Sequence, residues 1–571
     1  MPEYTTSTAF LEALGEAGVR YLFANLGSDH PGLIEAYALA RAQGRADRFP
    51  EIVICPHESV ALSAAQGYAQ VTGEPQAVVV HVDCGTQNVG GMLHNAAKAR
   101  IPVLLFAGAS PVTQEGELPG GRNEFIHWIQ DVHDQRGIVR GYTKYDNEIR
   151  TGHNVKQLVH RALQIARSSP AGPVYLVGAR EVMEQVLDSR PGVPLPAVEP
   201  AVLAPSTVRH IAKALTTAKK PVVVTSYAGR DPLAVPELVR LCEQLAIPVL
   251  ESVPTYVNFP ASNPLHAGYQ WNTREPNPVL AEADMVLVLG SDVPWIPVSN
   301  RPAADARVFV VDIDPLKEQM PLWQVPAELF ACADLRAALG QLADAVATSE
   351  IDAELVATRR AAAVAGYERQ GVERSLAETA LPDEITPEYL VSCVREAITE
   401  DTIVLSEAIT GFQVVNEHLR RSVPGTLLGS GGGSLGWHAG AAIGVKLAAP
   451  DSLVVSLVGD GTYLFGVPSS AQWVARRYGA PSLTVIIDNQ GWKAPKQSTL
   501  AVHPTGAAAR NDDFGVSFAP SADLPGIAMA AGGAWGRTVA DPAELPVLLK
   551  DAVEMVRSGR GAVLAVRCEP V

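Results

Sequence analysis

The sequence predicts an α/β protein with three doubly wound parallel-sheet domains. The chain has 571 residues, a length that accommodates three domains of roughly 150–200 residues. Short runs that are apolar throughout alternate with amphipathic helical patterns, which is typical of parallel sheets covered by helices on both faces. A proline-rich stretch at 188–206 and a charged, Ala-rich stretch at 346–386 separate three blocks, which we place at residues 1–187, 200–345 and 386–571.

The predicted strands are short and rich in Val, Ile, Leu and Ala. The first block has EIVIC, AVVVHV, PVLLFAG and PVYLVG; the second has PVVVTS, IPVLES, MVLVLG and VFVVDID; the third has TIVLS, SLVVSLV, LTVIID and AVLAVRC. Ligands of doubly wound sheets bind outside the carboxyl ends of the strands. The residues that directly follow these runs are therefore the first candidates for a functional site.

Composition and charge exclude several classes of function. The formal net charge is −16, which argues against a nucleic-acid partner bound through a generally basic surface. No apolar run approaches the roughly 18 residues of a membrane span, and the N-terminal MPEYTTSTAF lacks the pattern of a secretory signal. The six scattered cysteines form no CxxC pair, so neither a disulfide framework nor a zinc site is indicated. We expect a cytoplasmic protein that binds a small-molecule substrate and contacts neither nucleic acid nor membrane.

The third block places two oxygen-bearing side chains after two predicted strands. Asp460 stands between Gly459 and Gly461 directly after SLVVSLV, and Asn489 follows LTVIID. Two such ligands suit a hard cation such as Mg²⁺, which is usually shared with phosphate groups. The flanking glycines allow a diphosphate to approach the backbone closely. An ordinary glycine turn and a strand cap remain the alternative at this point.

Two further features fit a cofactor pocket. A second glycine-rich turn, GSGGGSLGW at 429–437, precedes the helical pattern HAGAAIGVKLAA and contributes Gly431, Gly432 and Gly433. Glu58 follows the strand EIVIC and opens a helical pattern of small apolar residues. The alternative role of a glutamate at this position is to complement the helix dipole.

These motifs resemble those of the thiamine diphosphate-dependent enzymes, in the superfamily of acetolactate synthase, pyruvate oxidase and benzoylformate decarboxylase. GDG followed by DN after 26 residues is similar to the family motif GDG…NN, with Asp488 in place of the first asparagine. CPHESVALSAAQGYAQVTGEP resembles the family pattern HE…A…A.GYA..TG.P, and the stretch HVDCGTQNVGGMLHNAAKARIPVLLFAG resembles the pattern that follows it. The resemblance covers nearly the whole chain.

The resemblance implies cofactors and roles for individual residues. The implied cofactors are thiamine diphosphate and Mg²⁺; FAD is not expected, because the second block lacks a GxGxxG fingerprint. The implied Mg²⁺ ligands are the side chains of Asp460 and Asn489 and the backbone carbonyl of Gly491. Glu58 would contact the aminopyrimidine ring from an apolar pocket, and Leu435 would support the bent cofactor. The implied cofactor contacts are Glu58, Gly431, Gly432, Gly433, Leu435, Gly459, Gly461 and Thr462.

The resemblance also implies an assembly. In this family the two halves of the cofactor site lie on different subunits, so that Glu58 of one chain works with Asp460 of another. A homodimer is then the minimum and a homotetramer is expected. The three blocks would be a pyrimidine-binding domain, a central domain, and a domain that binds the diphosphate and Mg²⁺.

Within the family, the resemblance is strongest to benzoylformate decarboxylase. YLFANLGSDHPGLIEAY resembles GNPGSNELPFL of that enzyme and places Ser28 on its active-site serine. His81, seven residues before Asn88, falls on its catalytic histidine. A hydroxyl can hold a substrate carboxylate, and an imidazole can transfer protons near neutral pH. Taken singly, a turn serine and a structural histidine are the alternatives.

The segment after the predicted metal site, GWKAPK, departs from benzoylformate decarboxylase. We expect a mobile lid over the substrate here, and two lysines in it would suit an anionic or CoA-bearing substrate. The candidate lid residues are Asp29, His30, Gln87, Trp492 and Lys493.

We therefore predict an enzyme, a non-oxidative carbon–carbon lyase that decarboxylates a 2-keto acid or cleaves and forms a 2-hydroxy ketone through an enamine on the cofactor. Three alternatives stay open on the sequence. The first is an acetolactate synthase-like carboligase with FAD, the second is a 2-hydroxyacyl-CoA lyase, and the third is a non-catalytic protein with the same fold.

Overall fold

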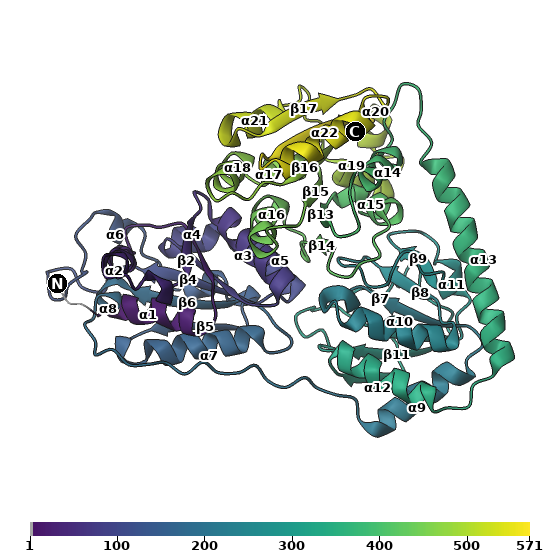
Figure 1. Cartoon of the computed structure of the whole chain (residues 1–571), viewed down its shortest axis with the longest axis horizontal. Helices are drawn as coiled ribbons and strands as arrows, with labels where there is room; N and C mark the ends of the chain where they lie inside the picture. Colours follow the sequence, from purple (N-terminus) through teal and green to yellow (C-terminus); the bar gives the residue numbers. More distant parts are fainter. Residues whose placement is uncertain (1–3) are drawn as a thin grey trace.

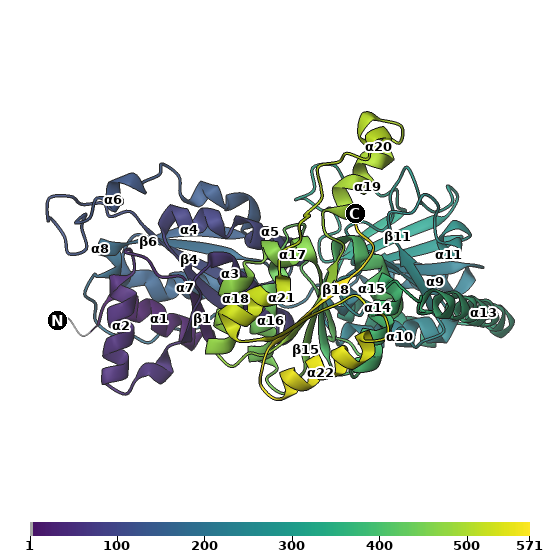
Figure 2. The ribbon, with the colours of Figure 1, turned by 90° about the horizontal axis from the view of Figure 1, so that it is seen from above.

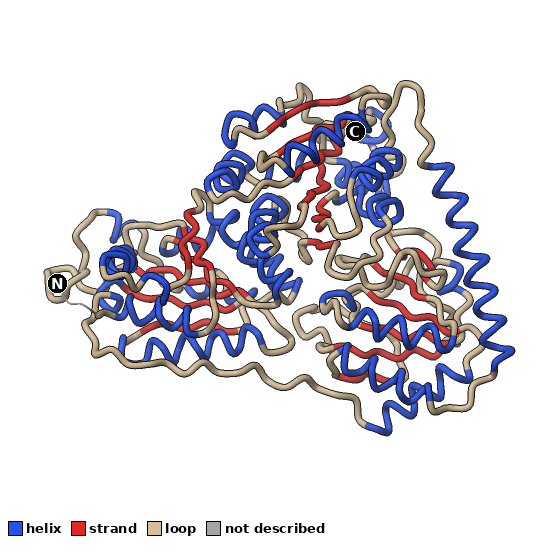
Figure 3. Tube along the Cα trace, in the orientation of Figure 1, coloured by secondary structure: helices blue, strands red, loops and turns tan. Residues whose placement is uncertain are grey.

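Three parallel six-stranded sheets, each flanked by helices, make up the protein (Figures 1 and 3). The structure is a computed structural model and describes residues 4–571. The sheets follow one another along the chain, so the predicted fold class is confirmed. The domain limits at 1–187, 200–345 and 386–571 stay a prediction.

The first sheet has the order β2-β1-β3-β4-β6-β5. Its strands are β1 (Tyr21–Ala24), β2 (Glu51–Ile54), β3 (Gln76–Val80), β4 (Val103–Ala109), β5 (Tyr145–Ile149) and β6 (Val174–Ala179). Its helices are α1 (Thr6–Glu16), α2 (Pro31–Ala42), α3 (Glu58–Thr72), α4 (Val82–Asn88), α5 (Gly90–Ala99), α6 (Ile126–Ile129), α7 (Val155–Arg167) and α8 (Arg180–Met183). The chain leaves β1 toward β2 on one side and returns as β3 on the other. The carboxyl ends of β1 and β3 therefore flank the crevice where such sheets bind ligands.

The second sheet has the order β12-β11-β10-β7-β8-β9, with its switch point between β7 and β10. Its strands are β7 (Pro221–Thr225), β8 (Val249–Ser252), β9 (His266–Gln270), β10 (Met285–Leu289), β11 (Arg307–Asp312) and β12 (Leu329–Cys332). Its helices are α9 (Pro205–Thr217), α10 (Ala234–Leu245), α11 (Pro278–Ala281) and α12 (Leu335–Ala347).

The third sheet has the order β14-β13-β15-β16-β18-β17. Its strands are β13 (Ile403–Glu407), β14 (Leu427–Gly429), β15 (Val454–Gly459), β16 (Leu483–Asp488), β17 (Trp535–Val539) and β18 (Ala562–Arg567). Its helices are α14 (Pro387–Ala397), α15 (Phe412–Leu419), α16 (Trp437–Ala448), α17 (Asp460–Phe465), α18 (Pro468–Arg477), α19 (Lys493–Val502), α20 (Ala507–Asn511), α21 (Leu524–Gly532) and α22 (Leu545–Arg557). β15 and β16 pair in parallel with Gly459 opposite Ile487, so Asp460 and Asn489 follow neighbouring strands.

Apart from the central β1, the strands that lie outside the predicted runs are found at sheet edges. They are β5, β9, β12, β14 and β17, and each is the first or last strand of its sheet. An edge strand is covered less completely than a central one, so its residues need not be apolar throughout. β12 alternates between partly buried and exposed residues, and β17 exposes two of its five residues. The predicted runs therefore mark mainly the central strands.

Two connecting segments join the sheets. Residues 187–204 form neither helix nor strand, whereas α13 (Ala353–Ala377) runs as one long helix along the outer side of the second sheet (Figure 1). Across residues 4–571, none of the helices combines the length and apolar character needed to cross a membrane.

Helix α3 of the first unit packs closely against α16 of the third (Figure 1). A β-carbon at Gly67 would lie 2.8 Å from the Cα of Ala441, and one at Gly444 would lie 2.8 Å from the carbonyl carbon of Ala64. The small residues of both helices therefore permit this contact, which buries the helix faces between the two units. Glu58, at the start of α3, is positioned by this packing.

Candidate active site

Three oxygen-bearing groups converge at the carboxyl ends of β15 and β16. One polar atom of the Asn489 amide lies 3.1 Å from Asp460 Oδ1 and 3.1 Å from the carbonyl oxygen of Gly491. If the amide oxygen takes this place, three oxygens face one another, which is the donor type that a hard cation binds. If the nitrogen takes it, the amide donates a hydrogen bond to both oxygens. The structure thus brings the three predicted ligands together, and their role in binding Mg²⁺ stays a prediction.

The carboxylate of Asp460 is held in place by backbone groups. Its two oxygens accept hydrogen bonds from the N–H groups of Gly461 (2.8 Å) and Gly491 (3.0 Å). Burial, together with the nearby carboxylate of Asp488, raises the pKa of Asp460 to about 6. Asp488 is itself buried and pairs with Arg567 at 2.8 Å. A bound cation would compensate the negative charge that the fold concentrates here.

This site is not built from a cluster of acidic, histidine or cysteine side chains. No group of three or more such residues capable of holding a metal occurs within residues 4–571. The reason is that the convergent set contains one carboxylate, one amide and one backbone carbonyl. The GDG and DN spacing was the signal that located it.

The indole of Trp492 covers Gly461. A β-carbon at Gly461 would lie 2.7 Å from Cη2 of Trp492. The indole also meets the ring of Phe518 edge to face, with 5.0 Å between centroids. The backbone N–H of Trp492 donates to the carbonyl of Val516 (3.0 Å), and the backbone N–H of Phe518 donates to the carbonyl of Gln490 (2.8 Å). These contacts join two segments of the chain directly beside the loop that carries Asn489 and Gly491.

The segment between these two anchors projects from the molecule. It contains α19 and α20, which extend away from the third sheet (Figure 2). Lys493 opens α19, and Lys496 pairs with Asp512 at 3.2 Å across the excursion. Of the predicted lid residues, Trp492 thus belongs to the base of this segment and Lys493 to its start.

The glycines predicted to contact the cofactor fall into two groups. β-carbons at Gly431 and Gly432 would meet Ala99 and Asn95 on α5, so packing between the first and third units accounts for these glycines. The space beside Gly433 is open, and a β-carbon at Gly459 would have no neighbour nearer than 3.9 Å. The open positions are the ones that leave room for a ligand at the backbone.

The buried Glu407 fixes the start of α16, and sequence reasoning missed it. Its carboxylate accepts hydrogen bonds from the backbone N–H groups of Trp437 (3.1 Å) and His438 (2.9 Å), and it contacts His438 Nδ1 at 2.9 Å. This arrangement anchors the turn that carries the half-buried Leu435. The available signal was an acidic residue at the carboxyl end of the run TIVLSE.

His81 and Asp29 form a hydrogen-bonded pair in the crevice between β1 and β3. His81 Nδ1 lies 2.6 Å from Asp29 Oδ1, and Asp29 Oδ2 accepts a hydrogen bond from the N–H of Val82 at 3.1 Å. The hydrogen bond that His81 donates to Asp29 raises the pKa of His81. This contact fixes the ring orientation and leaves Nε2 as the nitrogen available to a substrate.

Asp29 and His30 were predicted as lid residues, and both side chains are buried. His30 Nδ1 accepts a hydrogen bond from the N–H of Gly27 at 3.0 Å, and burial lowers the pKa of His30. Both residues support the turn below His81 instead of covering it. Ser28 is half-buried in this turn, and Gln87 is exposed and bonds Asp83 at 3.2 Å.

Glu58 lies at the first position of α3 and accepts a hydrogen bond from Asn88 Nδ2 at 2.6 Å. Its side chain is half-buried in the single chain, so the expected apolar pocket is not closed around it. No hydrogen bond among residues 4–571 links the groups around Glu58 and His81 to Asp460. The structure therefore presents two groups of predicted site residues, one on the first sheet and one on the third.

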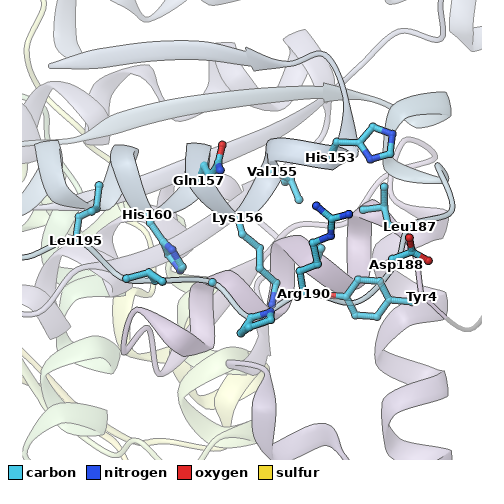
Figure 4. Close-up of a pocket in the computed structure, with 15 residues that line it drawn as sticks. Tyr4, His153, Val155, Lys156, Gln157, His160, Leu187, Asp188, Arg190 and Leu195 are labelled. Atoms are coloured by element: carbon cyan, nitrogen blue, oxygen red, sulfur yellow. The ribbon is translucent and has the colours of Figure 1, made fainter.

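A cavity of about 430 Å³ between α1 and α7 is not part of this site (Figure 4). Lys156 enters it but pairs with Glu12 at 2.8 Å and Glu16 at 2.7 Å. His160 lies 3.2 Å from the carbonyl of Ala13. Because these charged groups are satisfied internally, the cavity does not compete with the strand-end site.

The donor set fits the group that the sequence implies. With the amide oxygen of Asn489 turned inward, Asp460, Asn489 and Gly491 would present three oxygens to a cation, and Gly459 and Gly433 leave open backbone beside them. The start of α17 at Asp460 points backbone N–H groups toward the same region, which suits a diphosphate. Mg²⁺ with a bound diphosphate is consistent with this arrangement.

Comparison with known proteins gives three matches to one family. The thiamine pyrophosphate enzyme N-terminal TPP binding domain matches residues 4–138, the central domain matches residues 208–342, and the C-terminal TPP binding domain matches residues 408–566. Together the three matches cover most of the chain.

Individual relatives differ in their described activities. The chain is 25% identical to a probable acetolactate synthase large subunit of Methanocaldococcus jannaschii, over 77% of this chain and 73% of the relative. It is 25% identical to a sulfoacetaldehyde acetyltransferase of Castellaniella defragrans, over 99% of this chain and 93% of the relative. It is 26% identical to a probable 2-ketoarginine decarboxylase of Pseudomonas aeruginosa, over 96% of this chain and 92% of the relative.

A solved structure agrees with this fold over the full chain. The thiamine diphosphate-dependent 4-hydroxybenzoylformate decarboxylase of Rhodococcus jostii RHA1 superposes with a TM-score of 0.80 at 21% identity, covering 100% of both chains. With the three family domains in order along one chain, the protein belongs to the thiamine pyrophosphate enzyme family.

Proposed function

We propose that the protein is a thiamine diphosphate- and Mg²⁺-dependent lyase that decarboxylates a 2-keto acid or cleaves and forms a 2-hydroxy ketone without oxidation. The convergence of the Asp460, Asn489 and Gly491 oxygens carries this proposal, because it fits a cation shared with a diphosphate. The chemistry that thiamine diphosphate supplies when bound is a carbanion nucleophile for a substrate carbonyl.

Residues of the chain would bind and orient the cofactor. Asp460, Asn489 and the Gly491 carbonyl would hold Mg²⁺, with Gly459 and Thr462 beside the diphosphate. Glu58 would hold a proton shared with the pyrimidine ring, and its hydrogen bond from Asn88 orients the carboxylate for this contact.

The pair formed by His81 and Asp29 supports a proton-transfer role near neutral pH. Asp29 accepts a hydrogen bond from Nδ1–H of His81, so that Nε2 would exchange a proton with the substrate. Ser28, in the same turn, would hold the substrate carboxylate. The segment with α19 and α20 would cover the site and exclude water.

An acetolactate synthase-like carboligase is the second candidate, favoured by similarity to the methanogen relative. That alternative includes FAD, and the switch point of the second sheet argues against a flavin there. Arg100 lies 3.2 Å from both Asp292 and Asp314, and Lys317 lies 2.8 Å from Asp292 and 2.7 Å from Asp312. This ion-pair network occupies the carboxyl ends of β10 and β11. A 2-hydroxyacyl-CoA lyase is the third candidate.

We further propose a cytoplasmic homodimer or homotetramer in which Glu58 of one chain works with Asp460 of another. The half-buried state of Glu58 in the single chain supports a site completed by a second copy. The exposed apolar side chains of Phe125, Trp128 and Ile129 on and beside α6 suit such a contact.

A substrate panel tests the proposed activity. CO₂ release from aromatic and branched 2-keto acids would be measured with thiamine diphosphate and Mg²⁺, together with aldehyde release from 2-hydroxy ketones and 2-hydroxyacyl-CoAs. We expect turnover of at least one 2-keto acid or 2-hydroxy ketone, and none in Glu58→Gln although the variant folds. Turnover confined to 2-hydroxyacyl-CoAs, bound-flavin absorbance, or undiminished activity of Glu58→Gln would contradict the proposal.

A further inference from the structure

A second cavity, of about 480 Å³, lies where the connecting helix α13 passes between the second and third units. Its walls come from α13, from the edge strand β9 with the loop before α11, and from the end of α15. Figure 1 shows α13 along the outer side of the second sheet, with β9 and α15 between it and the body of the protein. The cavity is separate from the strand ends that carry Asp460 and His81.

Three arginines line this cavity, and two of them have no charged partner within residues 4–571. Arg369 and Arg374, both on α13, make no hydrogen bond or ion pair through their guanidinium groups with these residues. Arg420, at the end of α15, donates to the hydroxyl of Tyr367 at 2.6 Å and to the carbonyl of Ala261 at 3.2 Å. The cavity is thus lined by three positive charges, and among residues 4–571 no carboxylate forms a close ion pair with any of them.

The charged form of the half-buried Arg374 is disfavoured by its surroundings. Burial and the neighbouring Arg420 guanidinium lower the pKa of Arg374. A guanidinium removed from water needs an anion or hydrogen-bond acceptors to compensate the lost hydration. An anion between Arg374 and Arg420 would supply this compensation.

The other ionisable groups of the cavity do not take that role. His266 is within 3.2 Å of Glu251, and His418 is within 2.9 Å of Glu378, so both imidazoles are already paired. Glu417 accepts a hydrogen bond from a neighbouring glutamine on α15 and forms no close ion pair with an arginine among residues 4–571; burial raises its pKa.

One more acidic side chain, Glu373, faces the cavity from α13. It is exposed, and within residues 4–571 it forms no ion pair with an arginine. The local balance therefore favours an anionic ligand over a cationic one.

We propose that this cavity binds a small dianion, either a phosphate monoester or a dicarboxylate, between the guanidinium groups of Arg369, Arg374 and Arg420. Planar guanidinium groups match the oxygens of both ligand classes by paired hydrogen bonds. The bound dianion joins α13 to the end of α15, and α15 follows β13, whose last residue Glu407 anchors the cofactor-side helix α16. The site is independent of the catalytic proposal, because none of its residues belongs to the strand-end groups.

Calorimetric titration tests this site directly. Inorganic phosphate and succinate would be titrated separately into the wild-type protein saturated with thiamine diphosphate and Mg²⁺, so that the diphosphate region is already filled. We expect one saturable site for at least one of them, and the stronger of the two distinguishes phosphate esters from dicarboxylates. Arg374→Gln should weaken binding by about tenfold or more, since a hydrogen bond to a charged group is lost.

Matched variants separate a specific site from general attraction. Arg360→Gln removes a charge from the same helix outside the cavity, where the guanidinium already pairs with Glu243 at 2.8 Å, and should leave binding unchanged. Arg369 is exposed, so Arg369→Gln should fold normally and still weaken binding, which keeps the test decisive if Arg374→Gln does not fold. Absence of saturation for both probes up to about 10 mM, or equal weakening by Arg360→Gln and Arg369→Gln, would overturn the proposal.

Discussion

The indole of Trp492 lies on Gly461 so closely that a β-carbon there would stand 2.7 Å from Cη2 of the ring. Gly461 donates its N–H to Asp460, and Gly491, next to Trp492, donates to the other oxygen of the same carboxylate. The aromatic contact therefore fixes two of the backbone donors that orient Asp460. One of the two glycines of the GDG motif is explained by protein packing, and the other faces open space.

This difference predicts that the same substitution at the two glycines affects different properties, stability at Gly461 and cofactor binding at Gly459. Gly461→Ala should destabilise the cofactor-free protein by about 1–3 kcal/mol through overpacking against Trp492. Gly459→Ala meets no protein atom nearer than 3.9 Å and should leave the melting temperature of the cofactor-free protein unchanged. It should instead weaken binding of thiamine diphosphate, whose diphosphate approaches that backbone. Thermal unfolding without cofactor and fluorescence titration with cofactor measure the two effects.

A compensating variant checks the cause of the first effect. Gly461→Ala combined with Trp492→Ala should recover part of the lost stability, because the added methyl group then meets space vacated by the indole. If the two changes are simply additive, the contact between these residues is not the source of the destabilisation.

The pKa of Asp460 predicts the pH dependence of metal binding. A carboxyl group must lose its proton to bind Mg²⁺, so affinity should fall by about tenfold per pH unit below the pKa of about 6. Calorimetry with Mg²⁺ alone between pH 5 and pH 7.5 measures this without interference from the cofactor phosphates. An affinity that is constant over this range would contradict the assignment of Asp460 as a ligand.

The same shift has a defined effect on the stability of the metal-free protein. The folded-state pKa of about 6 lies above the ordinary value of 3.8, so the protonated carboxyl favours folding below pH 3.8, and this contribution is lost as the pH rises through 6. This contribution to the stability of the metal-free protein is therefore smallest above pH 6, where Mg²⁺ should raise the melting temperature most.

The contact between His81 and Asp29 predicts a shifted pH profile for Asp29→Asn. Asp29 raises the pKa of His81 from the ordinary 6.5, so removing its charge should lower that pKa. If protonated His81 donates a proton, activity falls as the pH rises through its pKa, and the variant should lose activity at lower pH than the wild type. We also expect kcat/KM to fall by about tenfold or more.

A control distinguishes orientation of the imidazole from general damage. Asp83→Asn removes a neighbouring carboxylate that bonds the exposed Gln87 and raises the pKa of His81 less than Asp29 does, so it should shift the alkaline limb less. NMR titration of the His81 ring should show the larger fall in pKa in Asp29→Asn. An unchanged His81 titration in that variant would contradict the proposed pairing.

Mixing two inactive variants tests whether the site is shared between chains. Glu58→Gln and Asp460→Asn should each lack activity, but a mixed dimer contains one site with both native residues. After dissociation and random reassociation, about a quarter of the wild-type activity should return. Sites contained within single chains would give no recovery, and light scattering would establish the number of chains in each sample.

The fold class could be predicted because burial leaves a direct mark on composition. Runs such as LTVIID and MVLVLG are apolar on both faces of a strand, and helical patterns between them require parallel crossovers. Edge strands such as β12 and β17 carry no such mark, because one side of each is open and polar residues are tolerated there.

The residues of the predicted metal site could be located because two local sequence motifs follow adjacent strands. Asp460 and Asn489 directly follow β15 and β16. Once these two strands pair in parallel, their carboxyl ends lie side by side, so the two residues are brought together. The support of His81 by Asp29 could not be located in this way. It depends on the separation between two strand ends and on which side chains are buried there.

The sequence by itself therefore determined the three parallel sheets, the family and the positions of Glu58, His81 and Asp460 in the chain, since apolar periodicity and glycine spacing are local properties. Only the tertiary structure decided that Gly461 is required by Trp492, that Asp29 and His30 are buried supports, and that Glu407 anchors α16. The physical reason is that close packing and hydrogen bonding join residues far apart in the chain, and no local pattern records which partners the fold brings together.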